Sequence, residues 1–403
     1  MKRLRSTFFL LLLFGLSATL RGEICSLDTV PAATLLLPYF EVDLASPSGR
    51  TTLISIANAS DQPTLAHVVL WTDVGIPTLA FDIYLTGFDV QTLNFRDLFA
   101  GNLPATADAA RDPGDGLSPV GEGLEDATFP GCQGLLPPQP LTAEFREHLR
   151  RAHLGLSSAL ANNACLGLPT AGQRARGYAT VDVVRRCSTL TPADAAYYGT
   201  GGVIGDDNVL WGEFFLIDPA QSYAQGENLV RIESAPGRFV QNDRTFYGRF
   251  VQDSGIDGRE PLPVRWGGRF IRRGLFDGGT DMIVWRQNTQ RSTPFSCASV
   301  PSTANLPIAF YGVFDEEEEF DTVGCFFDPC PPFVPFPAET GRYSLAAGAT
   351  PVPFDFGWLL LDLQPSDQAW VGSISSAQGQ FSVGLNATPM TSSCGPLPDG
   401  SLP

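Results

Sequence analysis

Three histidines are the side chains best suited to acid–base chemistry or metal binding in this chain of 403 residues. His67 lies in an apolar run, and the sequence places no second ligand or nucleophile near it, which favours a structural role. His148 and His153 fall on one expected helix, where a separation of five residues turns their side chains about 140° apart. Because such a pair cannot easily hold one metal ion, we interpret both as solvated helix residues.

The sharpest charge feature is an acidic run with six carboxylates in seven positions: Asp315, Glu316, Glu317, Glu318, Glu319 and Asp321. These carboxylates repel one another, and a bound Ca²⁺ would relieve the repulsion through oxygen ligands. However, the run lacks EF-hand spacing, and runs of like charge are usually exposed to solvent. We therefore favour a solvated acidic loop, keep Ca²⁺ as the weaker alternative, and expect no other cofactor.

The common catalytic signatures HExxH, GxSxG and GxxxxGK are absent from the sequence. A glycosidase would need only two carboxylates about 5–10 Å apart. With 43 acidic residues such pairs are unavoidable, so the sequence selects none. Asp182 and Asp362 occur at matching places in two similar segments, and we interpret both as structural residues, for example ones that bond turn amides.

Eight cysteines, an even number, predict disulfides more readily than metal ligands in an exported chain. Cys132 and Cys165 bracket an expected helix, so one predicted pair joins them, and a second joins Cys25 to Cys187. The other four are assigned to the second half of the chain: Cys297, Cys325, Cys330 and Cys394.

The first 22 residues have the order of a secretory signal peptide, which is a basic start, an apolar run and then small residues. The apolar stretch of about 13 residues is shorter than the roughly 20 that span a bilayer. No later segment offers a membrane span. We therefore expect cleavage of residues 1–22 and a mature protein that is secreted, periplasmic or on the cell surface.

The net charge of −17 indicates that the protein does not bind nucleic acid, whose phosphates are bound by basic patches. Lys2 is the only lysine and lies in the expected signal peptide. Mechanisms that need a Schiff-base lysine or a P-loop lysine are thereby excluded.

The elements that must position these residues are short strands. Segments rich in branched and aromatic residues recur between Gly, Pro, Asn and Asp, as expected for antiparallel sheets. The first five expected strands are Thr34–Val42, Thr51–Asn58, Ala66–Thr72, Ala80–Thr86 and Val90–Phe95.

An internal repeat runs through the chain, and its matching pieces keep the same order in both halves. Gly49–Asn58 matches Gly278–Asn288, and Gly177–Val183 matches Gly357–Leu363. The strand pattern resembles that of immunoglobulin-like sandwiches, although the Cys…Trp…Cys spacing of antibody domains is missing. We predict an all-β chain of two tandem immunoglobulin-like β-sandwich domains, residues 23–238 and 239–403.

The first domain is longer, and we assign the excess to an inserted loop and helix at about residues 100–170. The loop is rich in Gly, Pro and Asp. The helix is indicated by Phe145, Leu149, Ala152, Leu156 and Leu160 at helical spacing, with Thr142 capping its start and Asn162–Asn163 its end.

The sequence thus favours an exported, non-enzymatic protein with a binding, adhesion or surface-structural role, whose partner is an unidentified protein or glycan. The alternative is a secreted hydrolase of the glycosidase type. A deep cleft with two convergent carboxylates would indicate the enzyme, whereas shallow surfaces with function on loops would indicate the binding protein.

Overall fold

The computed structural model describes residues 30–106, 129–136, 138–199, 201–235, 245–251, 257–288, 290–299, 301, 308–322, 338–345, 354–363, 368–377 and 381–390. The regular structure of these residues is mostly β. The first half contains β1 Thr34–Asp43, β2 Thr51–Asn58, β3 Thr64–Thr72, β4 Pro77–Leu85, β5 Val90–Asn94, β6 Arg174–Val184, β7 Leu210–Asp218, β8 Tyr223–Asn228 and β9 Val230–Ile232. The second half contains β10 Arg265–Ile271, β11 Gly279–Arg286, β12 Ile308–Phe314, β13 Phe320–Thr322, β14 Thr340–Ser344, β15 Phe356–Leu363, β16 Ala369–Ala377, β17 Phe381–Asn386 and β18 Thr388–Pro389.

The five strands expected before residue 96 correspond to β1–β5. The burial of each strand follows from what covers it. β7 alternates buried and more exposed residues, as a strand with one solvent face should. β3 is buried at every position, because its outer face is also covered: Trp71 stacks on Phe250 and His67 bonds to the carbonyl of Leu190.

Among the described residues the strands form two outer sheets and one central sheet. The outer sheets have the orders β4-β3-β6-β1-β9 and β13-β12-β15-β10-β18. Strands at the same place in these two sheets are nine apart in chain order. The central sheet has the order β14-β11-β16-β17-β8-β7-β2-β5. Strands at equal distances from its middle again differ by nine in chain order: β17 and β8, β16 and β7, β11 and β2, and β14 and β5.

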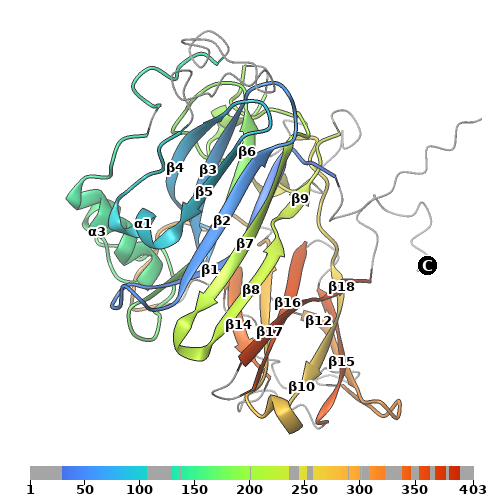
Figure 1. The fold of residues 1–403 in the computed structure, drawn as a ribbon. Coiled ribbons are helices and arrows are strands. Elements are labelled where there is room, and N and C mark those ends of the chain that lie inside the picture. The colour runs from blue at the N-terminus through green and yellow to red at the C-terminus, as the bar shows by residue number, and fades with distance from the viewer. Residues whose placement is uncertain are drawn as a thin grey trace, which may run out of the picture.

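The two halves meet in the middle of the central sheet, where Ser382 of β17 pairs in parallel with Tyr223 of β8. Figure 1 shows the first half, in blue and green, above the second half, in orange and red. The two faces of β11 have different neighbours: Met282 lies against Gly268 of β10, whereas the adjacent Asp281 lines a pocket that β1 of the first half also lines.

The apolar interiors of the halves are in contact. Buried side chains from both belong to one connected cluster. The ring centroids of Tyr178 and Trp285 are 5.8 Å apart across the junction, and those of Phe214 and Trp370 are 6.5 Å apart. The expected domain boundary at residues 238 and 239 lies outside the described residues, as do the expected signal peptide and most of the inserted loop.

The expected helix in the insertion is present, but it is shorter than the sequence pattern suggested. α3 spans Ala143–Leu154, and the Thr142 hydroxyl accepts a hydrogen bond from the Phe145 amide, as expected of an N-cap. The helix ends at Gly155, whose φ of 68° is the left-handed conformation that glycine adopts at helix ends. Leu156 and Leu160 therefore do not extend its buried face, and both are exposed.

The predicted disulfide pairing was wrong. Cys132 is bonded to Cys187, not to Cys165, and Cys165 is bonded to Cys297 in the second half. Cys187 is thus not available to Cys25. The remaining cysteines lie outside the described residues: Cys25, Cys325, Cys330 and Cys394.

The two disulfides indicate that the protein resides in an oxidising environment, since such bonds are rare in reducing compartments. Among the described residues, every helix is too short or too polar to cross a membrane.

Candidate functional site

A pocket of about 350 Å³ opens at the seam between the two halves. We call it the seam pocket. β1, β6, the loop before β6 and Arg50, which directly precedes β2, line it from the first half, and β11 and β14 line it from the second. Its lining residues are Tyr39, Glu41, Arg50, Thr170, Ala171, Arg174, Arg176, Asp281, Arg342 and Ser344.

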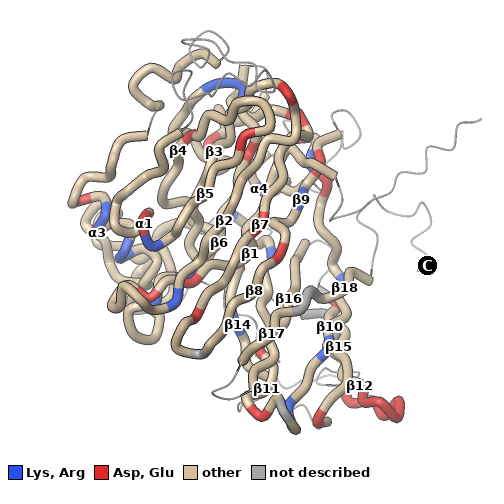
Figure 2. Tube along the Cα trace, in the orientation of Figure 1, with Lys and Arg blue, Asp and Glu red and all other residues tan. Residues whose placement is uncertain are grey.

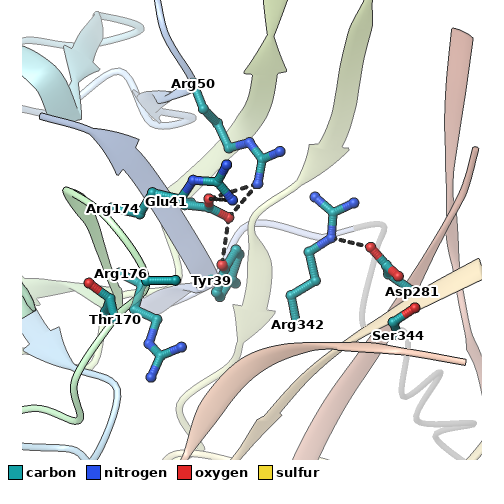
Figure 3. Close-up of a pocket in the computed structure, with 10 residues that line it drawn as sticks. Tyr39, Glu41, Arg50, Thr170, Arg174, Arg176, Asp281, Arg342 and Ser344 are labelled. Atoms are coloured by element: carbon teal, nitrogen blue, oxygen red, sulfur yellow. Dashed lines mark hydrogen bonds and ion pairs between the residues drawn. The ribbon is translucent and has the colours of Figure 1, made fainter. Parts of the chain in front are cut away.

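Arg50 and Glu41 form the charged centre of the first-half wall (Figure 3). Nη1 of Arg50 donates to both carboxylate oxygens of Glu41 at 2.7 Å, and Nε donates to Asp218 at 2.9 Å. The Tyr39 hydroxyl donates to Glu41 Oε2 at 2.8 Å. Burial opposes the charge of Arg50, but Glu41 and Asp218 raise the pKa of its guanidinium above the ordinary value. Arg50 therefore stays a cation.

The other three arginines are held more loosely. Arg342 donates from Nε to Asp281 at 2.6 Å, and Arg176 donates from Nε to Asp73 at 2.8 Å. Arg174 is more than half exposed, and its nearest carboxylate oxygen, on Glu41, is 3.7 Å away. Each of these guanidinium groups keeps N–H donors beyond the contact that anchors it.

Sequence reasoning did not find the seam pocket. The lining arginines are scattered over the turn before β2 and the strands β6 and β14, and each alone looks like an ordinary solvent-facing residue. The partners are far apart in the chain: Arg50 and Asp218 are separated by 168 residues. The one available signal was the run Arg174–Arg176, where two arginines two apart on a strand point to the same side.

A second polar cluster is buried under the first outer sheet, around Asp182. Its carboxylate accepts hydrogen bonds from Thr34, from Tyr197 at 2.6 Å and from Tyr247 at 2.8 Å. The guanidinium of the fully buried Arg259 lies 3.6 Å away. Because these groups are buried and bond one another, we interpret the cluster as one that serves the fold.

Asp362, the sequence counterpart of Asp182, is paired with Arg265 across β10 and β15 at 2.7 Å. In the part of the chain that the structure describes, the partners found for both acids are side chains: Thr34 of β1, Tyr197 and Tyr247 for Asp182, and Arg265 of β10 for Asp362. The turn amides suggested from the sequence are not among these partners.

His67 belongs to the same buried region, in line with a structural role. Nδ1 lies 2.7 Å from Asp82 Oδ1, and Nε2 lies 2.8 Å from the carbonyl oxygen of Leu190. Since both neighbours are acceptors, both ring nitrogens must carry hydrogen. Burial opposes this charge, but the Asp82 carboxylate raises the pKa of His67 above the ordinary value.

His153 is not solvated, contrary to expectation: it is 1% exposed. Its ring packs against Phe40 and Phe99, with centroids 5.3 Å away in each case. Nδ1 donates to the backbone carbonyl of Arg176 at 2.9 Å, and Nε2 lies 2.8 Å from the Thr78 hydroxyl. Burial lowers the pKa of His153 to about 4. His148 is half-buried and bonds to Ser158.

Acid should therefore destabilise the protein through His153. Unfolding frees the ring to take up a proton below about pH 6.5, which the folded state resists until about pH 4. Between pH 7 and pH 4, the free energy of unfolding of the wild-type protein should fall by as much as about 3 kcal/mol more than that of His153→Gln. Urea denaturation at both pH values checks this, with His148→Gln as the control. Equal losses in wild type and His153→Gln would contradict it.

The acidic run forms the turn between β12 and β13 (Figure 2). Asp315 Oδ1 accepts the backbone N–H groups of Glu317 and Glu319, at 2.9 and 2.8 Å, and so closes the turn. The side chains from Glu316 to Glu319 are exposed. In the part of the chain that the structure describes, His, Cys, Asp and Glu side chains nowhere gather in threes as a metal site would need.

Calcium is consequently expected to leave the melting temperature unchanged. One carboxylate oxygen of Asp315 already accepts hydrogen bonds from turn amides. The neighbouring side chains are exposed, so each of their carboxylates stays hydrated. Differential scanning calorimetry with and without millimolar calcium tests this. A rise that Asp315→Asn abolishes would establish a calcium site in the turn.

No family model, no curated protein and no solved structure matches this chain. Its function therefore has to be inferred from its own residues.

Proposed function

We propose that this is an exported, non-enzymatic binding protein made of two copies of an immunoglobulin-like β-sandwich unit, with the seam pocket as its ligand site. The strand orders support the two copies, since each outer sheet repeats the other with strands nine apart. The register supports them too. Phe40 faces Gly177 and Phe270 faces Gly357, while Asp182 and Asp362 lie opposite Thr34 and Arg265.

Export is supported by the basic and apolar start of the sequence together with the two disulfides. The acidic composition favours a partner other than nucleic acid. A glycan or another extracellular protein fits such a location.

The observation that carries the binding role is the composition of the seam pocket. It is open, it draws polar side chains from both halves, and its size falls in the range of small-ligand sites. A ligand there would contact Arg174 from one half and Arg342 from the other. Binding would therefore hold the halves together.

The hydrolase alternative is less well supported, because the carboxylates of the seam pocket are already engaged. Both oxygens of Glu41 accept hydrogen bonds from Arg50, and Asp281 accepts one from Arg342. A general acid must carry a proton to donate, and a nucleophile needs a free oxygen directed at the substrate. Carboxylates that neutralise arginines suit neither role.

A glycan array probed with the purified mature protein tests the proposal. We expect retention of a subset of glycans without release of shorter products, and loss of that retention in Arg174→Gln. Hydrolysis of any array member, lost in Glu41→Gln, would establish the hydrolase instead. Retention that Arg174→Gln leaves intact would place the ligand site elsewhere.

A further inference from the structure

We propose that the seam pocket recognises the carboxylate of an acidic sugar, a hydroxylated anion such as a uronic acid unit. The inference rests on the proposed binding function and names the ligand class. Three features of the pocket carry it: the charge of its lining, the orientation of its guanidinium groups and its unpaired hydroxyl.

Guanidinium groups outnumber carboxylates in the lining of the seam pocket. Four arginines face two acids among the residues that line the seam pocket. The further acids that anchor them, Asp73 and Asp218, are almost fully buried and are not part of the lining. A ligand in the pocket therefore meets guanidinium groups first.

The arginines are positioned for bidentate recognition. Arg342 and Arg176 are each fixed through Nε, by Asp281 and by Asp73. This contact orients the planar group and leaves the Nη1 and Nη2 donors to a ligand. Paired N–H donors on one guanidinium match the two oxygens of a carboxylate, which a lysine ammonium could not do. Figure 3 shows Arg342 across the seam pocket from Arg174, so an anion between these two arginines would be held from both halves.

The pocket also offers hydroxyl chemistry. Thr170 Oγ1 is buried in the lining and has no hydrogen-bond partner among the residues that the structure describes. A buried polar atom without a partner is unfavourable unless a water or a ligand supplies one. Ser344 adds a second hydroxyl to the lining, and Ala171 is the one aliphatic residue in it. A polyol that also bears a carboxylate satisfies such a lining better than an apolar acid does.

Isothermal titration calorimetry with free D-glucuronate, D-glucose and sulfate tests the proposal on the full chain. We expect glucuronate to bind more tightly than sulfate, and glucose to bind least. Arg174→Gln and Arg342→Gln should each weaken glucuronate binding about tenfold or more, as expected for the loss of a hydrogen bond to a charged group. Raising the salt concentration should weaken it as well, because Arg174 is exposed and its field is screened.

Arg273→Gln is the matched control, since Arg273 is an exposed, ion-paired arginine outside the seam pocket. It should leave affinity unchanged, and circular dichroism verifies the folding of every variant. Sulfate binding as tight as glucuronate binding would reduce the pocket to a general anion site and overturn the acidic-sugar class. Array glycans that need Arg174 but contain no acidic sugar would refute the ligand class and keep the binding function. Absence of any ligand that needs Arg174 would refute both.

Discussion

Replacing Glu339 with alanine is expected to lower the free energy of unfolding by about 3–5 kcal/mol, because it leaves a buried arginine without its counter-ion. Arg249 is 3% exposed and Glu339 is 1% exposed. Arg249 donates from Nη2 to Glu339 Oε2 at 3.0 Å, and the Tyr178 hydroxyl donates to the same oxygen at 2.9 Å. Urea denaturation followed by circular dichroism at neutral pH measures the loss.

The position of Glu339 explains why the effect should reach both halves. The residue precedes β14 of the second half, and its backbone amide donates to the Asp73 carbonyl of the first half at 2.7 Å. Its carboxylate lies over Gly75, where a side-chain carbon would collide with it. Gly75 also has a φ of 78°, a conformation that glycine adopts without strain. Glycine at position 75 therefore leaves the space that the Glu339 carboxylate occupies.

Two variants separate the ion pair from simple loss of packing. Arg249→Met combined with Glu339→Leu removes both charges, and should recover much of the stability that Glu339→Ala loses. Asp355→Ala removes the acid of the exposed Arg273–Asp355 pair, and should cost less than about 1 kcal/mol. If Glu339→Ala cost no more than Asp355→Ala, the buried pair would not hold the halves together.

The sequence predicted local structure well where one physical signal dominates. β2 lies between a glycine-containing turn and Asn58, and its alternating apolar residues set its bounds. Thr142 was identified as the N-cap of α3 because hydroxyl side chains bond the free amides of a first turn. The end of α3 was missed because Leu156 and Leu160 continue the helical spacing, while Gly155 stops the helix by its backbone conformation.

Side-chain partners could not be predicted, since they depend on which strands become neighbours. His153 looked like a polar residue of a surface helix, yet it is buried because α3 lies over β6 and turns this side chain toward Phe40 and Phe99. Arg249 and Glu339 are 90 residues apart, and no periodicity links them. The seam pocket is lined by residues of both halves, so its residues can be recognised as one site only when the order of the strands is known.

Removing the Cys165–Cys297 disulfide is expected to lower stability by up to about 5 kcal/mol, because the bond closes a loop of 132 residues. Loop-closure entropy in the unfolded chain grows with loop length, so this bond should matter more than Cys132–Cys187, whose 55 residues correspond to about 4 kcal/mol. Paired cysteine-to-alanine variants compared by urea denaturation give both values.

Hydrogen exchange shows which part of the chain loses stability when each disulfide is removed. Cys165 and Phe295 also exchange backbone hydrogen bonds, at 2.9 and 3.0 Å, and these are the contacts that the disulfide protects. We expect the amides of residues 290–299 to exchange faster without Cys165–Cys297, and those of residues 129–136 to exchange faster without Cys132–Cys187. The seam pocket should respond only to the first, because Thr170 follows Cys165 by five residues and that bond ties its loop to the second half. Faster exchange confined to the first half in both variants would mean that Cys165–Cys297 does not couple the halves.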